Sequence, residues 1–353
     1  MRSRGAVADQ AMRMASLASR PLWAPAMQSA SAGLWRQRLA ANCQARCAAG
    51  AAGITPGERL SGLRKMLAAG KLVRIVEAHS GFSALIADKA RATRPDGSTA
   101  TFDMLWSSSL TSSAMKGKPD IEVVDTGERC SIVQDVMEVS TKSILYDGDT
   151  GGEKEIFRWT VQRLERLGVS GVVIEDKSGL KQNSLFGTER AQQLEDIGTF
   201  CQKLKMGKEA QVTKDFMIFA RIEALIAGLG EEEALKRARA YVQEGGADGI
   251  MIHSKEKSPD EILSFMKRWR AEAPDVPVIC VPTSYNSITE DELKAAGVNI
   301  CIYANQLIRA SYHAMMDTAE KILLAGRSKE VDGQILETKK MITLIDDNTG
   351  GKA

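Results

Sequence analysis

A charged triplet and a polar loop follow a short apolar run near the middle of the chain. The run at 172–174 (Val-Val-Ile) is typical of a buried strand, and the residues at 175–177 (Glu-Asp-Lys) bring charge to its end. The loop beyond Gly179 carries one cation, one amide and one hydroxyl, namely Lys181, Asn183 and Ser184. Together these groups can hold a phosphoryl group without reacting with it. A polar surface loop is the alternative interpretation.

Polar residues follow several other apolar runs in the same way. They are Glu77 with His79, Trp106 with Ser107 to Ser109, Asp147 with Asp149, Arg221 with Glu223, and His253 with Ser254. If the runs are parallel strands of one barrel, their carboxyl ends meet at one face, where ligands bind. One charged strand end is ordinary because loops are polar. Six of them support a single site.

Three carboxylates stand at strand ends that are expected to be neighbours: Asp147, Asp149 and Glu175. A site rich in oxygen, without a thiolate or imidazole cluster, suits a hard divalent cation. A cation that keeps several waters points to Mg²⁺. The alternative is that these acids simply pair with Lys177 and Arg221.

One of the three histidines, His253, also stands at a strand end. A single histidine there is more often structural. Beside Arg221 it could form half of a clamp for a phosphoryl group.

Short apolar segments alternate with helical patterns from about residue 61 onward. The predicted strands are 73–79, 102–106, 143–146, 171–174, 216–223, 249–254, 276–282 and 298–303. The predicted helices are 61–70, 80–92, 110–115, 153–167, 188–206, 231–244, 259–272, 290–296 and 306–325. Eight such repeats favour an α/β fold, a closed (β/α)8 TIM-type barrel rather than an open doubly wound sheet. No Gly-x-Gly-x-x-Gly follows the first strand, which weakens a dinucleotide site.

Composition points to a small-molecule partner. Lysine and arginine (47) nearly balance aspartate and glutamate (45) over 353 residues, so no charge excess favours nucleic acid or a membrane surface. No apolar run approaches the roughly 20 residues of a membrane span. The six cysteines have no zinc or disulfide spacing, which fits a reducing compartment.

The first fifty or so residues have a different composition from the rest. Residues 1–53 are rich in arginine, alanine and serine, and Asp9 is their single acidic residue. This composition is typical of a mitochondrial or plastid transit peptide. A plain extension or a misassigned start codon is the alternative, which would leave the protein cytoplasmic. We therefore expect an extension at 1–53, a catalytic barrel at 54–326 and a helical tail at 327–353.

The run Glu175-Asp176-Lys177, followed after five residues by Asn183-Ser184, resembles the phosphoenolpyruvate mutases of the isocitrate lyase and phosphoenolpyruvate mutase superfamily. Similar stretches occur at 77–81, 106–110, 147–151, 220–224 and 251–255, and the resemblance spans Leu63 to Ala325. It implies a barrel with C-terminal helices for oligomerisation. It also implies a Mg²⁺-dependent isomerase that interconverts phosphoenolpyruvate and phosphonopyruvate, the entry step to phosphonate biosynthesis.

The resemblance implies a role for each site residue. Asp147 would ligate the metal, with Asp149 and Glu175 reaching it directly or through water. The substrate's carboxylate and enolate end would bind the backbone amides of Ser109 and Leu110 and the side chain of Ser108. Its phosphoryl group would bind Asn183, Ser184, Arg221 and His253. Trp106 would wall the pocket, Asp120 matches an acidic residue of the family's site, and Lys181 lies on a gating loop.

Some positions depart from the family pattern. Gly148 stands where alanine is usual, and Gly152-Glu153 stands where an aromatic residue and glycine are usual. Ser107 and Ser109 replace more usual glycines. These changes would allow a looser metal loop or an altered anion-binding site, but they remove no expected ligand.

Rival activities and the assembly follow from the same resemblance. A phosphonopyruvate hydrolase would share the fold and metal, but the Asn183-Ser184 ending of the loop looks like the mutase form. A carbon–carbon lyase of the methylisocitrate type would carry a loop cysteine, which 181–184 lacks. A catalytically silent barrel is the alternative from another class.

A homotetramer or homodimer that exchanges helix 306–325 is expected, with a plain packed helix as the alternative.

Overall fold

The computed structural model describes residues 53–179, 181–189 and 192–345. These described residues cluster as one compact unit. The expected extension lies outside the described residues apart from Gly53. Within the described ranges, none of the helices has the length and apolar character needed to cross a bilayer.

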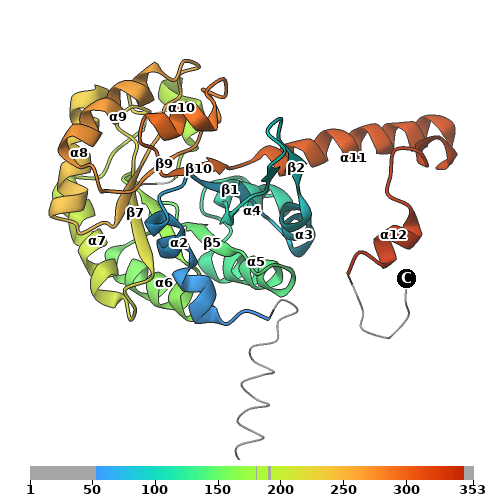
Figure 1. Ribbon diagram of the computed structural model, residues 1–353, viewed down its shortest axis with the longest axis horizontal. Coiled ribbons are helices and arrows are strands. Elements are labelled where there is room, and N and C mark those ends of the chain that lie inside the picture. Colours follow the sequence, from blue (N-terminus) through green and yellow to red (C-terminus); the bar gives the residue numbers. More distant parts are fainter. Residues whose placement is uncertain (1–52, 180, 190–191, 346–353) are drawn as a thin grey trace, which may run out of the picture. The chain divides into compact units, whose positions relative to one another are not determined.

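Eight parallel strands close into a barrel (Figure 1). Their bounds are β1 Val73–Glu77, β4 Met104–Ser107, β5 Ser143–Asp147, β6 Gly171–Glu175, β7 Met217–Ile222, β8 Gly249–Ile252, β9 Val278–Cys280 and β10 Ile300–Tyr303. Each strand pairs with the next in this order, and β1 pairs with both β4 and β10, which closes the ring. The predicted (β/α)8 barrel is confirmed. All its strands point the same way, so their carboxyl ends share one rim.

Both faces of the strands are buried, which explains why the strands are continuous apolar runs rather than alternating ones. In β6, Val172 and Ile174 pack in the cluster beneath the helices, whereas Val173 belongs to the cluster inside the barrel. Leu63, from the helix that precedes β1, joins the inner cluster. The barrel therefore has a packed interior, and space for a ligand lies at the rim.

The helices around the barrel are α2 Pro56–Ala68, α3 Gly81–Lys89, α4 Ser109–Met115, α5 Thr126–Val139, α6 Lys154–Leu167, α7 Ile197–Ala210, α8 Gly230–Gln243, α9 Asp260–Glu272 and α10 Glu290–Ala295. The predicted first helix was too short at its start. Thr55 and Glu58 form a capping box and Pro56 occupies the first turn, so α2 begins before residue 61. The predicted helix 188–206 was also displaced, because Ser184–Glu189 is the 3-10 helix η1 and α7 starts after its cap, Asp196.

Two elements were not predicted. Helix α5 lies between β4 and β5, and the short strands β2 Ala92–Thr93 and β3 Thr99–Ala100 form an antiparallel hairpin. Helix α5 mixes buried apolar residues with a buried arginine, Arg129, which obscures its helical pattern. This helix turns out to matter for the site.

The C-terminal elements are α11 Gln306–Ala325, the 3-10 helix η2 Lys329–Val331 and α12 Thr338–Ile342 (Figure 1). Helix α11 has no buried residue along its described length. Its first turn is tied to the barrel because the Ile308 amide donates to Glu77 of β1 at 2.7 Å. The remaining turns leave large apolar side chains exposed, among them Met315 and Leu323.

Candidate active site

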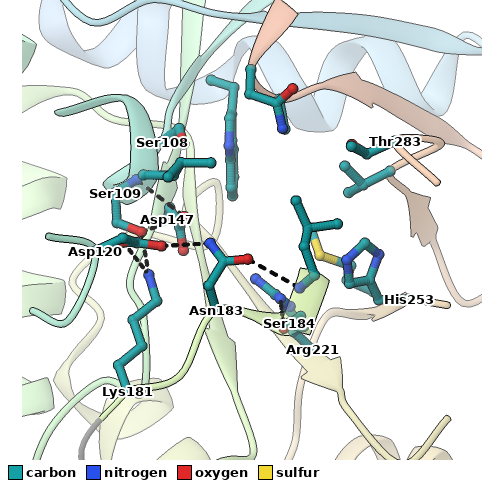
Figure 2. A pocket seen from close by; sticks show the side chains of 17 residues that line it. Ser108, Ser109, Asp120, Asp147, Lys181, Asn183, Ser184, Arg221, His253 and Thr283 are labelled. Atoms are coloured by element: carbon teal, nitrogen blue, oxygen red, sulfur yellow. Dashed lines mark hydrogen bonds and ion pairs between the residues drawn. The ribbon is translucent and has the colours of Figure 1, made fainter. Parts of the chain in front are cut away.

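A pocket lies at the carboxyl ends of the strands (Figure 2). It is lined by Trp106, Ser108, Ser109, Leu110, Asp120, Asp147, Lys181, Asn183, Ser184, Leu185, Arg221, Met251, His253, Val281, Thr283, Ala304 and Asn305. This set contains every predicted site residue apart from Asp149 and Glu175. Both of these contact the lining, Asp149 through Lys181 and Glu175 through Arg221. Residues that are far apart in the chain, and that were predicted to meet because most of them follow strands, therefore lie in or beside one pocket.

One side of the pocket is an acidic cluster, which consists of Asp120, Asp147 and Asp149 around the ammonium of Lys181. Lys181 Nζ donates to Asp149 Oδ1, to Ser109 Oγ and, at 2.9 Å, to Asp120 Oδ1. Burial opposes the charge on Lys181, but Asp149 and Asp147 raise its pKa well above the ordinary value. The buried ammonium is therefore charged and is held by oxygen atoms.

Asp147 is the centre of this cluster. Its Oδ2 accepts from the Ser109 amide at 3.1 Å and from Ser109 Oγ at 3.0 Å, and its Oδ1 accepts from the Asp149 amide at 3.3 Å. Burial would raise the pKa of Asp147, but Lys181 and Arg129 lower it below the ordinary value. The carboxylate is thus ionised and oriented before any ligand arrives.

The donor chemistry of this cluster fits a hard divalent cation, since its oxygens already surround a positive charge. Within the described ranges, however, no three acidic, histidine or cysteine side chains form a ready-made metal centre. Glu175, expected beside the two aspartates, instead faces Arg221 at 3.2 Å and Lys177 at 4.0 Å. A cation that keeps several waters needs only one or two carboxylates from the protein, the number that Asp147 and Asp149 would offer.

The loop that carries the two aspartates is held tightly. The Gly148 amide donates to Val173 O at 2.7 Å, and a Cβ at this position would come within 2.9 Å of that oxygen. Thr150 donates through its amide and its hydroxyl to Glu122, at 3.0 and 2.8 Å. Glycine at 148 thus permits a close approach to β6.

The other side of the pocket is an arginine cluster, which consists of Arg221 and Lys177 with Ser184, Glu175 and Glu223. Arg221 donates to Glu223 Oε1 and to Ser184 Oγ, both at 2.6 Å. Lys177 pairs with Glu223 at 3.0 Å and donates to Ser184 Oγ at 2.7 Å. The charged side chains stand at or just beyond the paired ends of β6 and β7, where Glu175 lies beside Arg221 in register, whereas Ser184 belongs to the loop after β6.

Burial separates the two glutamates of this cluster. It raises the pKa of Glu175 to about 7, against the opposing effect of Arg221 and Lys177. Glu223 is also buried, but Arg221 and Lys177 hold its pKa well below the ordinary value. The raised pKa of Glu175 weakens its negative charge near neutral pH, so Arg221 and Lys177 are balanced mainly by Glu223. The arginine cluster keeps a positive excess that suits an anionic ligand.

The loop after β6 closes over the pocket. Asn183 Nδ2 donates to Asp120 Oδ2 at 2.8 Å, close to the contacts of Lys181 (Figure 2). The base of the loop is joined by backbone bonds from Ser178 to Gln193 and from Glu195 to Asp176, at 3.0 and 2.8 Å. The loop is thus pinned at its base and docked at its tip on the acidic cluster.

His253 lines the pocket near Arg221. Burial lowers the pKa of His253 to about 4, and the charge of Arg221 acts in the same direction. The imidazole is therefore neutral near pH 7. It can donate one N–H to a ligand, but it adds no positive charge until it is protonated.

Several site residues were missed from the sequence. Thr283 and Asn305 follow β9 and β10, so the strand-end rule used elsewhere would have found them. Glu223 is predicted at a strand end without a role, and Lys177 is considered there only as a partner for the carboxylates. Arg129, which donates to Asp149 at 2.9 Å, lies within a helix and carries no such signal.

A closed barrel with these two clusters at its carboxyl rim defines a class of protein, a barrel enzyme for a small anionic substrate. Comparison with known proteins makes the class specific. A family model described as phosphoenolpyruvate phosphomutase matches residues 63–323. The chain belongs to the phosphoenolpyruvate phosphomutase family.

Individual relatives agree with this assignment. The chain is 38% identical to a phosphoenolpyruvate phosphomutase of Tetrahymena pyriformis, over 80% of this chain and 89% of that protein. A solved phosphoenolpyruvate phosphomutase from Streptomyces platensis subsp. rosaceus superposes with a TM-score of 0.74 at 36% identity, covering 81% of this chain and 94% of that one. A phosphonopyruvate hydrolase solved with oxalate and Mg²⁺ has a TM-score of 0.72 at 33% identity, with the same coverage.

Proposed function

We propose that this protein is a phosphoenolpyruvate mutase, which moves a phosphoryl group between oxygen and carbon within one substrate molecule. The observation that carries the proposal is the docked loop. It places Asn183 at a pocket that combines the acidic cluster with the arginine cluster. The expected substrates are phosphoenolpyruvate and phosphonopyruvate.

The isomerisation conserves atoms and electrons within one substrate molecule and needs no second substrate. In the direction of phosphoenolpyruvate, the bond from C3 to phosphorus breaks and its electron pair passes into the pyruvate enolate, whose oxygen then bonds phosphorus. Charge in the transition state spreads over the phosphoryl oxygens, so the enzyme mainly has to position the group and offer donors. Arg221 would supply positive charge, while Asn183, Ser184 and His253 would supply neutral donors.

The pyruvate end would bind at the start of α4. The amides of Ser109 and Leu110, with the Ser108 side chain, would hold the carboxylate, and Trp106 would wall the pocket. The Ser109 amide now donates to Asp147, so it would have to change partner when substrate binds.

The acidic cluster would hold Mg²⁺. Asp147 would ligate the ion, with Asp149 and Glu175 reaching it directly or through water. When bound, Mg²⁺ would act as a Lewis acid that stabilises the negative charge of the enolate. The related hydrolase structure that contains oxalate and Mg²⁺ supports this choice of metal.

Water must be kept from the phosphoryl group, since hydrolysis is the competing reaction. Lys181, Asn183 and Leu185 all reach the pocket from the docked loop, and Asp120 anchors the first two. Such a closure excludes water and favours transfer within the substrate. The hydrolase reading remains the second candidate because a hydrolase is also among the relatives.

A phosphorus NMR time course with purified full-length protein, phosphonopyruvate and Mg²⁺ tests the proposal. A growing phosphoenolpyruvate signal, abolished by a chelator and strongly reduced in Asn183→Ala, is the expected result. Inorganic phosphate as the sole product would overturn the mutase in favour of the hydrolase. No turnover despite bound Mg²⁺ would support a catalytically silent barrel.

Assembly through α11 belongs to the same proposal. The helix leaves apolar side chains exposed, with Met315 at 70% and Leu323 at 81%. A cavity of about 400 Å³, with Phe102, Tyr303 and Leu307 in its lining, offers an apolar surface on the barrel. Exchange of α11 between subunits of a homodimer or homotetramer would cover such surfaces. Light scattering of Leu323→Glu, which we expect to yield smaller species than the native protein, tests this.

A further inference from the structure

Arg129 is a buried cation that reaches the metal loop from behind. It belongs to the first turns of α5 and is 3% exposed. Its Nη1 donates to Asp149 Oδ2 at 2.9 Å, and its Nη2 donates to the carbonyl of Ser107, the last residue of β4, at 3.0 Å. The guanidinium also lies over the ring of Tyr146, 4.2 Å from its centroid. One side chain thus joins β4, β5 and α5 behind the pocket.

The carboxylate of Asp149 is shared between two cations of different kinds. Oδ2 accepts from Arg129 on the rigid helix α5, whereas Oδ1 accepts from Lys181 on the closing loop. The backbone of Asp149 has φ of 53°, in the left-handed region that residues other than glycine rarely adopt. Surrounding contacts therefore have to hold this residue in place, and Arg129 is one of them.

We propose that Arg129 is a positioning residue that leaves only one oxygen of Asp149 for the metal and so makes the site favour small cations such as Mg²⁺ over Ca²⁺. The inference rests on the proposed metal site at Asp147 and Asp149. It concerns the residue that makes the site select this cation, which that proposal does not address.

The physical reason is the different coordination of the two ions. Mg²⁺ requires a compact octahedral shell and keeps several waters, so single oxygens from one or two carboxylates suit it. Ca²⁺ takes more ligands at longer distances and readily accepts both oxygens of one carboxylate. A guanidinium on Oδ2 blocks the second contact. Lys181 belongs to the docked loop, whose contacts can be exchanged, whereas Arg129 belongs to helix α5 of the barrel.

Two other groups, the exposed Glu122 and the buried Lys203, hold the same loop without touching the Asp149 carboxylate. Glu122 accepts from Thr150, and Lys203 Nζ donates to the Thr150 carbonyl at 3.0 Å. These contacts fix the backbone of the loop. Lys203 therefore provides a matched control, since it is a buried cation that supports the loop through its backbone.

The experiment measures cation binding to the full-length protein without substrate. Bound Mn²⁺ is followed by electron paramagnetic resonance and is displaced by Mg²⁺ or Ca²⁺, which yields the ratio of the Ca²⁺ and Mg²⁺ dissociation constants. We expect Arg129→Met to lower this ratio by about tenfold or more, the scale of outer-shell effects at metal sites. Arg129→Lys keeps the charge and loses the planar guanidinium fork, so its ratio should lie between that of the native protein and that of Arg129→Met. Lys203→Met should leave the ratio within about twofold of the native value.

The ratio of the two dissociation constants distinguishes a positioning role of Arg129 from a simple loss of charge or a general loosening of the loop. Loss of a positive charge would strengthen binding of both ions, and general loosening of the loop would weaken both, so each leaves the ratio unchanged. A native ratio in folded Arg129→Met overturns the inference. If that variant fails to fold, as judged by circular dichroism, the ratio of Arg129→Lys decides in its place. If the native protein binds none of the three ions, the proposed metal site itself fails.

Discussion

The acidic cluster and the arginine cluster face each other across one pocket, but they are built differently. The arginine cluster joins side chains at the paired ends of β6 and β7, where Glu175 and Arg221 are in register. The acidic cluster joins β5 to Asp120 and to Lys181, which lie on separate connecting segments. The charged side chains of the first are placed by strand pairing, and the loop adds only the Ser184 hydroxyl between them, whereas the second depends on a loop that has docked.

This difference indicates a division of labour. Strand ends in a closed barrel move little, so the arginine cluster is suited to holding the phosphoryl group in a constant position. Contacts made by a loop can be exchanged, so the acidic cluster is suited to admitting a metal ion and substrate and then closing. Lys181 and Asn183 are the residues through which the loop contacts the acidic cluster.

The largest effect is expected from Asp147→Asn. Removing this charge takes away the central carboxylate of the acidic cluster, and we expect roughly a thousandfold loss of isomerisation with weaker Mn²⁺ binding. Asp248→Asn is the control. Asp248 pairs with Arg64 and Lys208 just before β8, at the opposite end of the strands, and its loss should lower stability without this loss of metal affinity. Turnover of Asp147→Asn within tenfold of native would contradict a metal role for the cluster.

Arg221→Lys tests the other side. The substitution keeps the charge but loses the planar fork that bonds Glu223 and Ser184, and we expect roughly a hundredfold lower kcat. Mn²⁺ affinity in the absence of substrate should change little. A parallel fall in Mn²⁺ affinity would show that the two clusters are not independent.

Lys181→Met should alter the product more than the rate. The loop would lose its contacts with Asp149, Asp120 and Ser109, so it would open more often and admit water. We expect about a tenfold loss of isomerisation and a larger share of inorganic phosphate, measured by phosphorus NMR. Lys154→Met, which removes a half-buried lysine on α6 that does not line the pocket, is the control. An unchanged product ratio would mean that water exclusion does not depend on this lysine.

The smallest effect concerns the pH dependence of stability. The pKa of His253 is about 4 in the folded protein and about 6.5 when unfolded, so the unfolded chain takes up the proton first as pH falls. Stability should be unaffected by His253 above pH 6.5 and should decline toward pH 4, by about 3 kcal/mol in total. Free energies of unfolding, measured by denaturant titration between pH 6.5 and pH 4, should fall more steeply with falling pH for the native protein than for His253→Asn. Identical pH profiles would contradict a buried neutral imidazole.

Much of the barrel and of the pocket lining follows from a simple pattern in the chain. Buried parallel strands require continuous apolar runs, and a polar residue that directly follows such a run reaches the rim, as Asp147, Arg221 and His253 do. Element starts were less certain. The beginning of α2 depends on the Thr55 capping box, and the beginning of α7 depends on the cap at Asp196.

The amino-acid sequence by itself determined the fold class, the family resemblance and which residues stand at the strand ends, because hydrophobic periodicity and residue type are local properties. Tertiary structure alone decided how the charges pair. It turned Glu175 toward Arg221, placed Lys181 among the aspartates and brought Arg129 behind Asp149. Those pairings depend on desolvation and on distances of a few ångströms between segments far apart in the chain, and no spacing along a sequence encodes them.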